Sequence, residues 1–408
     1  MTFNIRNLKL IALTAAASAG LAAGGVAQAS IDTGSAASVL TPVKPDSTAA
    51  SKNSAEFDQA VIALKSMQLD QAEKLFKQAA LKQPKSPAPL IGLAEIARAR
   101  KNDAEVERLL RKAIDVDPKN AQTHLVMGSA FYSRGRLGDT EAEFLKAAEL
   151  APKSVAPLMA LADLYLNVMK RPDKAAEYFG KVIQLSPGQA SAHLGLGMSD
   201  VALHDFAAAE TSLNKARSLA PSSPLPLMAL AQLQGNRSKP KEAVALLQQA
   251  ADLAPTMEDI PLRMGIFYQQ LKQWNDAYAA YEKALRLNSK LVVAYNNLAW
   301  MAADRKERLD DAERWGAKAV ELVPNEPSLK DTYAWVKRAR GDNKAALALL
   351  ESITVTGNPR AEFFYHLAIV REELGQKPQA AAAYKRALEI NPQFGQAEDA
   401  KQRLGKLQ

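Results

Sequence analysis

Residues that stop helices recur along this chain at an interval of 34 or 35 residues. Most of them are prolines, and the full set is Pro84, Pro118, Pro152, Pro187, Pro221, Pro255, Ser289, Pro324, Asn358 and Pro392. A fixed period means that each repeat cannot bury its apolar face alone, so that neighbouring repeats must stack. The period therefore predicts a solenoid of about ten stacked repeats over residues 53–394.

Small residues recur at two fixed positions inside each period. The twentieth position holds Ala72, Ala209, Ala243, Ala277, Ala346 and Ala380, and the twenty-seventh holds Ala79, Ala113, Ala147, Ala216, Ala250, Ala284 and Ala387. In the two 35-residue repeats the first of these residues comes one step later, as Ala175 and Ala312. Small side chains at fixed offsets on two helices allow close helix packing, with large residues filling the space around them.

The same lattice resembles the tetratricopeptide repeat (TPR) family. Its pattern is a large residue, Leu-Gly, an aromatic residue, Ala-x3-aromatic and a terminal proline. Here His124-x2-Met127-Gly128-x2-Phe131 with Thr140-x3-Phe144 follows this pattern, and the resemblance covers residues 53–394. It implies an all-α, right-handed α-solenoid of about ten helix-turn-helix units that binds partners along a concave groove. Residues 395–408 are predicted to form a C-terminal capping helix, with Ala397, Ala400 and Leu404 covering the last repeat.

The segment before the repeats has the features of an export signal. Residues 1–29 combine a basic start at Arg6 and Lys9, an apolar stretch and the small-x-small motif Ala27-Gln28-Ala29. They are expected to form a Sec-type signal peptide that is cleaved before Ser30. A retained membrane anchor is the alternative, although the stretch is rich in alanine and glycine and marginal in length for a span.

The expected location of the mature chain is periplasmic or secreted, in a bacterium. Residues 30–52 are rich in Ser, Thr, Ala and Pro and are predicted to be a disordered lead-in. The chain has no cysteine, so that neither a bacterial lipid anchor nor a disulfide framework is expected.

Charge and motif content argue against nucleic-acid binding and catalysis. The formal net charge of +8 comes from basic residues that alternate with acidic ones, without a basic stripe. His124 and His193 are predicted to pack within the stack, because no second metal ligand follows at a suitable spacing. The carboxylates between Asp304 and Asp311 alternate with arginine and lysine and are predicted to form a solvated, salt-bridged turn. No catalytic residue, metal site or cofactor is predicted.

The first helix of each repeat lines the groove in the family that this chain resembles. Carried over position by position, the predicted partner-binding residues are Tyr132, Met159, Met198, Met228, Ile266, Trp300 and Trp335. Asn296, Asn297 and Asp331 flank the two tryptophans and are predicted to fix the partner by hydrogen bonds. A long exposed apolar strip indicates a partner, to which methionine adapts and which tryptophan anchors. Trp300 and Trp335 lie 35 residues apart and are predicted to be neighbours across one repeat step. Burial of both under the C-terminal repeats is the alternative.

Two short runs are similar to those of exported bacterial TPR proteins linked to exopolysaccharide export and to PEP-CTERM protein sorting. They are Tyr295-Asn296-Asn297-Leu298-Ala299-Trp300 and Asp331-Thr332-Tyr333-Ala334-Trp335. The favoured function is a periplasmic scaffold that binds a protein or extended peptide, for envelope assembly, secretion or exopolysaccharide export. The alternative is a solenoid that guides a polysaccharide through the periplasm, with the two tryptophans as a sugar platform.

Overall fold

A computed structural model describes residues 54–355 and 360–407, and every regular element in these ranges is a helix. Internal contacts divide the described residues into an N-terminal unit, residues 54–233, and a C-terminal unit that begins at Gln234. The predicted signal peptide (1–29), the lead-in (30–52) and the expected repeat end at Asn358 lie outside the described residues. The expected all-α repeat architecture is confirmed.

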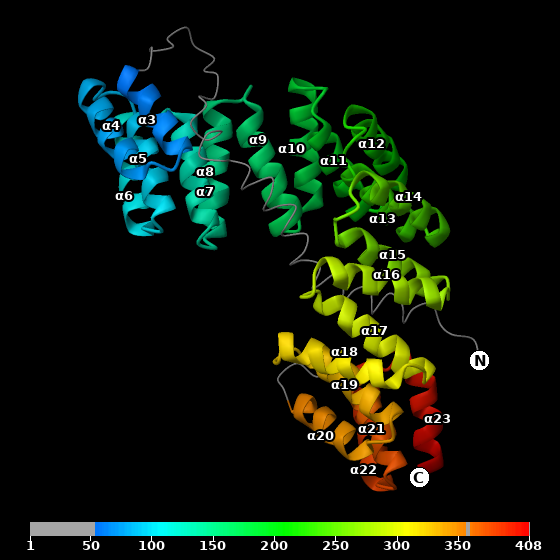
Figure 1. The fold of residues 1–408 in the computed structure, drawn as a ribbon. Helices are drawn as coiled ribbons and strands as arrows, with labels where there is room; N and C mark the ends of the chain where they lie inside the picture. The colour runs from blue at the N-terminus through cyan, green and yellow to red at the C-terminus, as the bar shows by residue number, and fades with distance from the viewer. Residues whose placement is uncertain (1–53, 356–359, 408) are drawn as a thin grey trace. The chain divides into compact units, whose positions relative to one another are not determined.

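The N-terminal unit is a stack of helix pairs (Figure 1). The helices are α3 (Ala55–Lys65), α4 (Leu69–Lys82), α5 (Ala88–Ala99), α6 (Asp103–Val116), α7 (Ala121–Tyr132), α8 (Leu137–Leu150), α9 (Val155–Asp163), the π-helix η1 (Leu164–Val168), α10 (Pro172–Leu185), α11 (Ala190–Ala202), α12 (Phe206–Leu219) and α13 (Leu225–Asn236), which continues past Leu233. From α3 to α12, each first helix packs on the second helix of its own pair, and α4, α6, α8 and α10 also pack on the first helix of the next pair.

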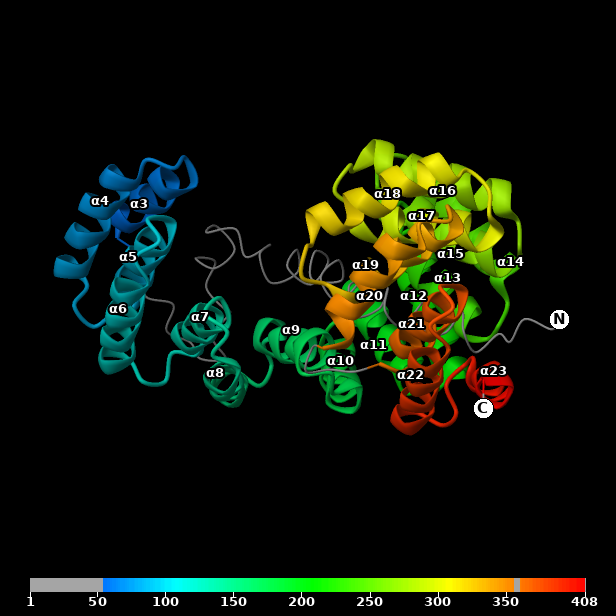
Figure 2. The same cartoon turned by 90° about the horizontal axis from the view of Figure 1, so that it is seen from below.

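The C-terminal unit repeats this arrangement, and Figure 2 shows its helices from a second side. They are α14 (Pro240–Leu253), α15 (Asp259–Gln270), α16 (Trp274–Leu287), α17 (Val292–Arg305), α18 (Leu309–Leu322), α19 (Pro327–Ala339), α20 (Asn343–Thr354), α21 (Ala361–Glu373), α22 (Lys377–Ile390) and α23 (Ala397–Leu407). The terminal helix α23 packs on α22 and buries Ala397 and Ala400. It therefore covers the apolar side of the last repeat.

Glycines on the first helices make room for aromatic rings from the second helices. A Cβ atom added at Gly195 on α11 would lie 2.2 Å from the ring of Phe179 on α10. The Phe179 ring is itself 1% exposed, so that it has no free space to move into. Gly180, one residue after Phe179, has no neighbouring atom within 4 Å of such a Cβ.

One substitution is therefore expected to have opposite effects at these two glycines. Gly180→Ala should stabilise the N-terminal unit by about 1 kcal/mol, because alanine restricts the unfolded chain and favours the helix. Gly195→Ala should destabilise it by about 1–3 kcal/mol through overpacking against Phe179. Urea unfolding followed by circular dichroism measures both changes. Equal effects of the two substitutions would show that Gly195 does not require a close helix approach.

The two 35-residue repeats accommodate their extra residue in different ways. In the fourth repeat the helical hydrogen bonds widen into η1, where the Met169 amide donates to the Leu164 carbonyl at 2.9 Å. In the eighth repeat the extra residue lies in the turn after α17, where Lys306 and Arg308 both have positive φ, at 53° and 50°. The same insertion in sequence thus gives a π-helix in one unit and a left-handed turn in the other.

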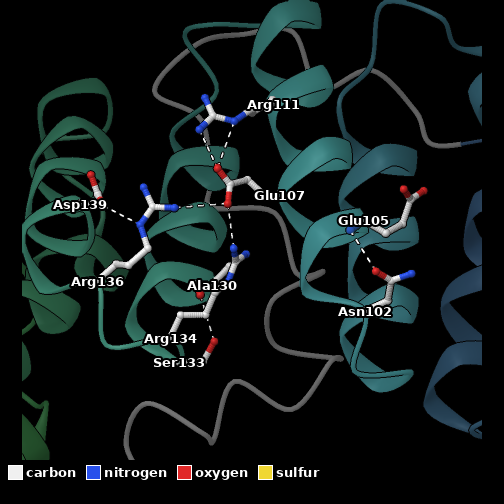
Figure 3. A network of polar contacts seen from close by, with 9 residues as sticks. All are labelled: Asn102, Glu105, Glu107, Arg111, Ala130, Ser133, Arg134, Arg136 and Asp139. Carbon is white, nitrogen blue, oxygen red and sulfur yellow. Dashed lines mark hydrogen bonds and ion pairs between the residues drawn. The ribbon is translucent and has the colours of Figure 1, made fainter.

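A network of charges connects the second and third repeats (Figure 3). Both oxygens of Glu107 on α6 are bound, one by Arg111 at 2.6 Å and the other by Arg134 at 2.7 Å and Arg136 at 3.3 Å. The arginine hydrogen bonds, that of Arg111 first, lower the pKa of Glu107. Arg136 also binds Asp139 at 2.7 Å. The ionised Glu107 carboxylate thereby fixes the turn between α7 and α8 against α6.

In the described part of the chain, no helix is long and apolar enough to cross a membrane.

Candidate partner-binding face

The first helices of the N-terminal unit present a partly exposed apolar surface. The fifth, ninth and twelfth positions of a repeat are spaced i, i+4 and i+7, so that they lie on one helix face. The large apolar residues at these positions of α7, α9 with η1, and α11 are Leu125, Tyr132, Met159, Leu166, Leu194, Met198 and Val201. We call these residues the N-terminal face. Four of them, Leu125, Tyr132, Met159 and Leu166, pack at the border of one core cluster around Leu161 and Leu164.

Met198 is the most exposed residue of this face. Its side chain is 39% exposed on α11, although methionine is mostly buried in folded proteins. Tyr132 and Met159 are half-buried. The structure thus brings three of the predicted site residues onto one face of the N-terminal unit.

Asp163 lies in the middle of this face, and the residue-based prediction missed it. It occupies the ninth position of its repeat, four residues after Met159 and directly before η1. Asp163 is only 9% exposed, and its carboxylate makes no hydrogen bond or ion pair with the described residues. Burial alone raises the pKa of Asp163 to about 7, because nothing compensates for the lost hydration of the carboxylate. The sequence does mark Asp163 as unusual, because it is a carboxylate at the ninth position of its repeat, where later repeats have Met198 and Ile266.

The C-terminal unit has a polar cluster at the equivalent positions. Asp331 and Trp335 on α19 both contact His366 on α21. The His366 Nδ1 atom lies 2.8 Å from the Asp331 carboxylate, and the rings of His366 and Trp335 are 4.5 Å apart between centroids. The Arg338 guanidinium lies 4.3 Å from the Trp335 ring centroid and binds Glu373 on α21. Trp335 and Asp331 therefore connect α19 to α21.

The predicted neighbour relation between Trp300 and Trp335 holds only in part. Both side chains are half-buried and pack against the same core cluster around Leu298 and Val336. Within the residues that the structure describes, however, no contact joins their two rings, and the aromatic partner of Trp335 is His366. An aromatic clamp formed by the two tryptophans is not present.

Two of the predicted site residues are buried, which corrects their assignment. Met228 on α13 is 6% exposed and belongs to the core. Asn297 on α17 is 3% exposed, and its amide Nδ2 donates to the Tyr281 hydroxyl at 3.2 Å. That hydroxyl donates in turn to Gln269 at 2.9 Å. Asn297 satisfies the buried Tyr281 hydroxyl and does not face a partner.

The two remaining predicted site residues, Ile266 and Asn296, are half-buried on α15 and α17. The Oδ1 atom of Asn296 is buried and has no hydrogen-bond partner. Sequence alone did not distinguish Asn296 from Asn297, because adjacent residues on a helix point about 100° apart and the exact phase depends on packing.

The turn after α17 forms an open pocket of about 400 Å³ on the side of the second helices. It is lined by Asn275, Tyr278, Ala279, Glu282, Glu307 and Arg308. Arg308 lies 4.7 Å from the Tyr278 ring and binds Glu282 and Asp311. Glu307 is bound by Arg305 at 2.5 Å, and Asp310 is bound by Arg340. The expected salt-bridged turn is confirmed, and its own ion pairs occupy the charges that line the pocket.

The described histidines with a predicted packing role have structural partners. His124 is buried, with Nδ1 2.7 Å from Glu143 and Nε2 3.2 Å from the Pro118 carbonyl. His193 lies 2.9 Å from the Pro187 carbonyl. Over residues 54–355 and 360–407, no three His, Asp or Glu side chains come together as a metal site. The surfaces described above are suited to binding through apolar contact and charge.

These features define a helical repeat protein of the protein-interaction type. Models of the tetratricopeptide repeat match residues 63–130, 169–233, 262–327 and 361–394, which together exceed half of the chain. The chain belongs to the tetratricopeptide repeat family, and the resemblance inferred from the residue lattice is confirmed.

Among known proteins, the chain is similar to "BBSome complex member BBS4" of Bos taurus. The two are 25% identical over 266 residues, which is 64% of this chain and 51% of the relative. The chain therefore spans about half the length of that relative. It is also 29% identical over 99 residues to "Protein O-mannosyl-transferase Tmtc1" of Drosophila melanogaster, covering 23% of this chain and 12% of that protein.

Among solved structures, human IFIT1 in complex with m7Gppp-AAAA has a TM-score of 0.52 and 16% identity. The match covers 81% of this chain and 84% of IFIT1. At this level of identity the likeness concerns the helical repeat fold alone.

Proposed function

We propose that this protein is a periplasmic, non-catalytic TPR scaffold that binds a protein or an extended peptide on the first helices of its repeats. Envelope assembly, secretion or exopolysaccharide export would be the process that it serves. The location is supported by the basic start, the apolar stretch and the Ala27-Gln28-Ala29 motif within residues 1–29. The binding role is supported by the family and by the fold.

The observation that carries the proposal is the partly exposed N-terminal face, with Met198 at its most accessible point. Met198, which is 39% exposed, forms an adaptable apolar surface together with half-buried Leu194, one helical turn earlier on α11. Such surfaces are depleted on monomeric proteins unless a partner covers them. The polysaccharide alternative has less support, because the Trp335 ring is in contact with His366 and Arg338 of its own chain.

A crosslinking experiment with a matched control tests the proposed face. Met198 on first helix α11 and Leu145 on second helix α8 are both 39% exposed. A photoreactive residue at position 198 in the producing cells should give discrete protein adducts, and the same residue at position 145 should not. Met159→Asp on the same face should abolish the adducts, since it places a charge in the apolar contact.

Adducts of equal yield from both positions, or none from position 198, would contradict binding at this face. Adducts to glycan alone, from position 198 or from Trp300, would favour the polysaccharide carrier. The location has its own measurement, which is N-terminal sequencing of the protein from a periplasmic fraction. A mature chain that starts at Ser30 is expected, and recovery of an uncleaved chain in the cytoplasmic fraction would exclude export.

A further inference from the structure

Asp163 is a buried carboxyl group for which the chain supplies no partner. It lies at the ninth position of the fourth repeat, between Met159 and Leu166 on the N-terminal face. The equivalent residue of the preceding repeat is Ser129, whose hydroxyl donates to the Leu125 carbonyl at 3.0 Å. The equivalent residue of the following repeat is Met198. Neither neighbour pairs with the carboxylate.

The second repeat contains the same carboxylate with its cation in place. Glu95 occupies the ninth position there and is 4% exposed, and Arg98 at the twelfth position binds its carboxylate. In the fourth repeat the twelfth position is Leu166. The fourth repeat thus has a buried acid at the ninth position, as the second repeat does. It lacks the basic residue at the twelfth position that neutralises Glu95 in the second repeat.

Lys174, a cation of the adjacent helix α10, is paired elsewhere in the unit. Glu141 on α8 accepts a hydrogen bond from the Tyr165 hydroxyl at 2.5 Å and lies 3.4 Å from the Lys174 ammonium of α10. Lys174 also lies 4.7 Å from the Tyr165 ring centroid. Burial is the cause of the raised Asp163 pKa, and no ion pair joins this carboxylate to a charged side chain of the described residues.

We propose that Asp163 receives a lysine or arginine side chain of the bound partner, so that the N-terminal face takes a peptide segment with one basic residue flanked by apolar residues. This inference rests on the proposed function and specifies its ligand. The apolar side chains of Tyr132, Met159 and Leu166 would contact the flanking residues. The basic group would occupy the place that Arg98 occupies beside Glu95.

Desolvation of Asp163 favours its pairing with a basic group. Folding has already removed most water from Asp163, so that an incoming ammonium or guanidinium would meet a carboxylate in a low local dielectric. The pKa of about 7 leaves the group partly protonated at neutral pH, and a cation would stabilise its ionised form. A buried charge pair across an interface contributes strongly to specificity, because a partner without the charge leaves the carboxylate unpaired.

The test is a selection of random nonapeptides displayed on phage, carried out against the full mature chain and against its D163N variant. With the wild-type chain we expect Lys or Arg to be enriched at one central position, flanked by Leu, Ile, Met or Phe. With Asp163→Asn the enrichment of basic residues should be lost while apolar enrichment remains. A synthetic peptide of the selected sequence should bind D163N at least about tenfold more weakly than the wild-type chain. Replacement of its basic residue by norleucine should abolish that difference.

Asp173→Asn is the matched control, because Asp173 is an exposed acid on second helix α10, with a side chain 58% exposed. It should leave the selection unchanged. Selection of apolar peptides without basic enrichment would overturn the role of Asp163 and leave the proposed face intact. Failure of the wild-type chain to select any peptide would contradict peptide binding itself, and with it this inference. Thermal unfolding of D163N verifies that the variant is folded.

Discussion

Asp163→Asn is expected to stabilise the N-terminal unit by about 4 kcal/mol at pH 8.5 and by almost nothing near pH 4. Burial raises the pKa of Asp163 from 3.8 to about 7 in the folded chain. Below pH 4 the carboxyl is protonated in both the folded and the unfolded states, so that its burial has no pH-dependent cost. Between pH 4 and pH 7 only the unfolded state loses the proton, and stability falls as the pH rises. Above pH 7 the full cost is present, at roughly 1.4 kcal/mol for each unit of pKa difference.

The measurement is urea unfolding of wild type and D163N at several pH values, followed by hydrogen exchange of peptides from α9 and α10. All four tryptophans lie at positions 274, 300, 315 and 335, so that their fluorescence reports on the C-terminal unit and a different probe is needed here. Asp173→Asn is the control, because its hydrogen bond with Arg171 lowers the Asp173 pKa and its loss cannot stabilise the unit. Parallel pH profiles of wild type and D163N would show that the Asp163 carboxyl remains hydrated.

Tyr281→Ala is expected to destabilise the C-terminal unit by about 4 kcal/mol. The Tyr281 ring is fully buried and packs under Gly265, where an added Cβ atom would lie 2.6 Å from the ring. Its removal creates a large cavity in the stack and also leaves Asn297 and Gln269 without their shared partner. Because repeats are stabilised mainly by their neighbours, the damage should be greatest in α15 to α18.

Tryptophan fluorescence during urea unfolding measures this effect directly. Tyr281→Phe is the control that keeps the ring and removes only the hydroxyl, and it should cost about 1–3 kcal/mol. Equal losses from the two substitutions would mean that the hydrogen bonds of Tyr281, and not its volume, hold this repeat together. A negligible loss from Tyr281→Phe would show that water replaces the hydroxyl, and Asn297 would then return as a candidate contact residue.

Repetition made the fold predictable, because the same small and large residues recur ten times and errors at single positions average out. Ser289 and Asn358 depart from the proline period without interrupting it. The candidate site was less predictable, since exposure depends on how each helix packs against its neighbours. Asn296 and Asn297 look equivalent in sequence, and only the second lies against the Tyr281 hydroxyl. Met228 matches the inward positions of other repeats, and packing buries it.

What the amino-acid sequence determined by itself is the class of architecture: an all-α repeat protein of the TPR family, built from helix pairs with small residues where they approach closely. Only the tertiary structure decided the local conformation at positions where the sequence allows more than one. The extra residue of the fourth repeat becomes a π-helix beside Asp163, whereas that of the eighth becomes a turn with two left-handed residues. Similarly, Glu95 has a cation three residues away and Asp163 has none. This difference affects the hydration and charge of Asp163 only because the fold buries its side chain. Periodicity encodes which helices stack, while the charge and hydration of one buried group depend on every side chain that surrounds it.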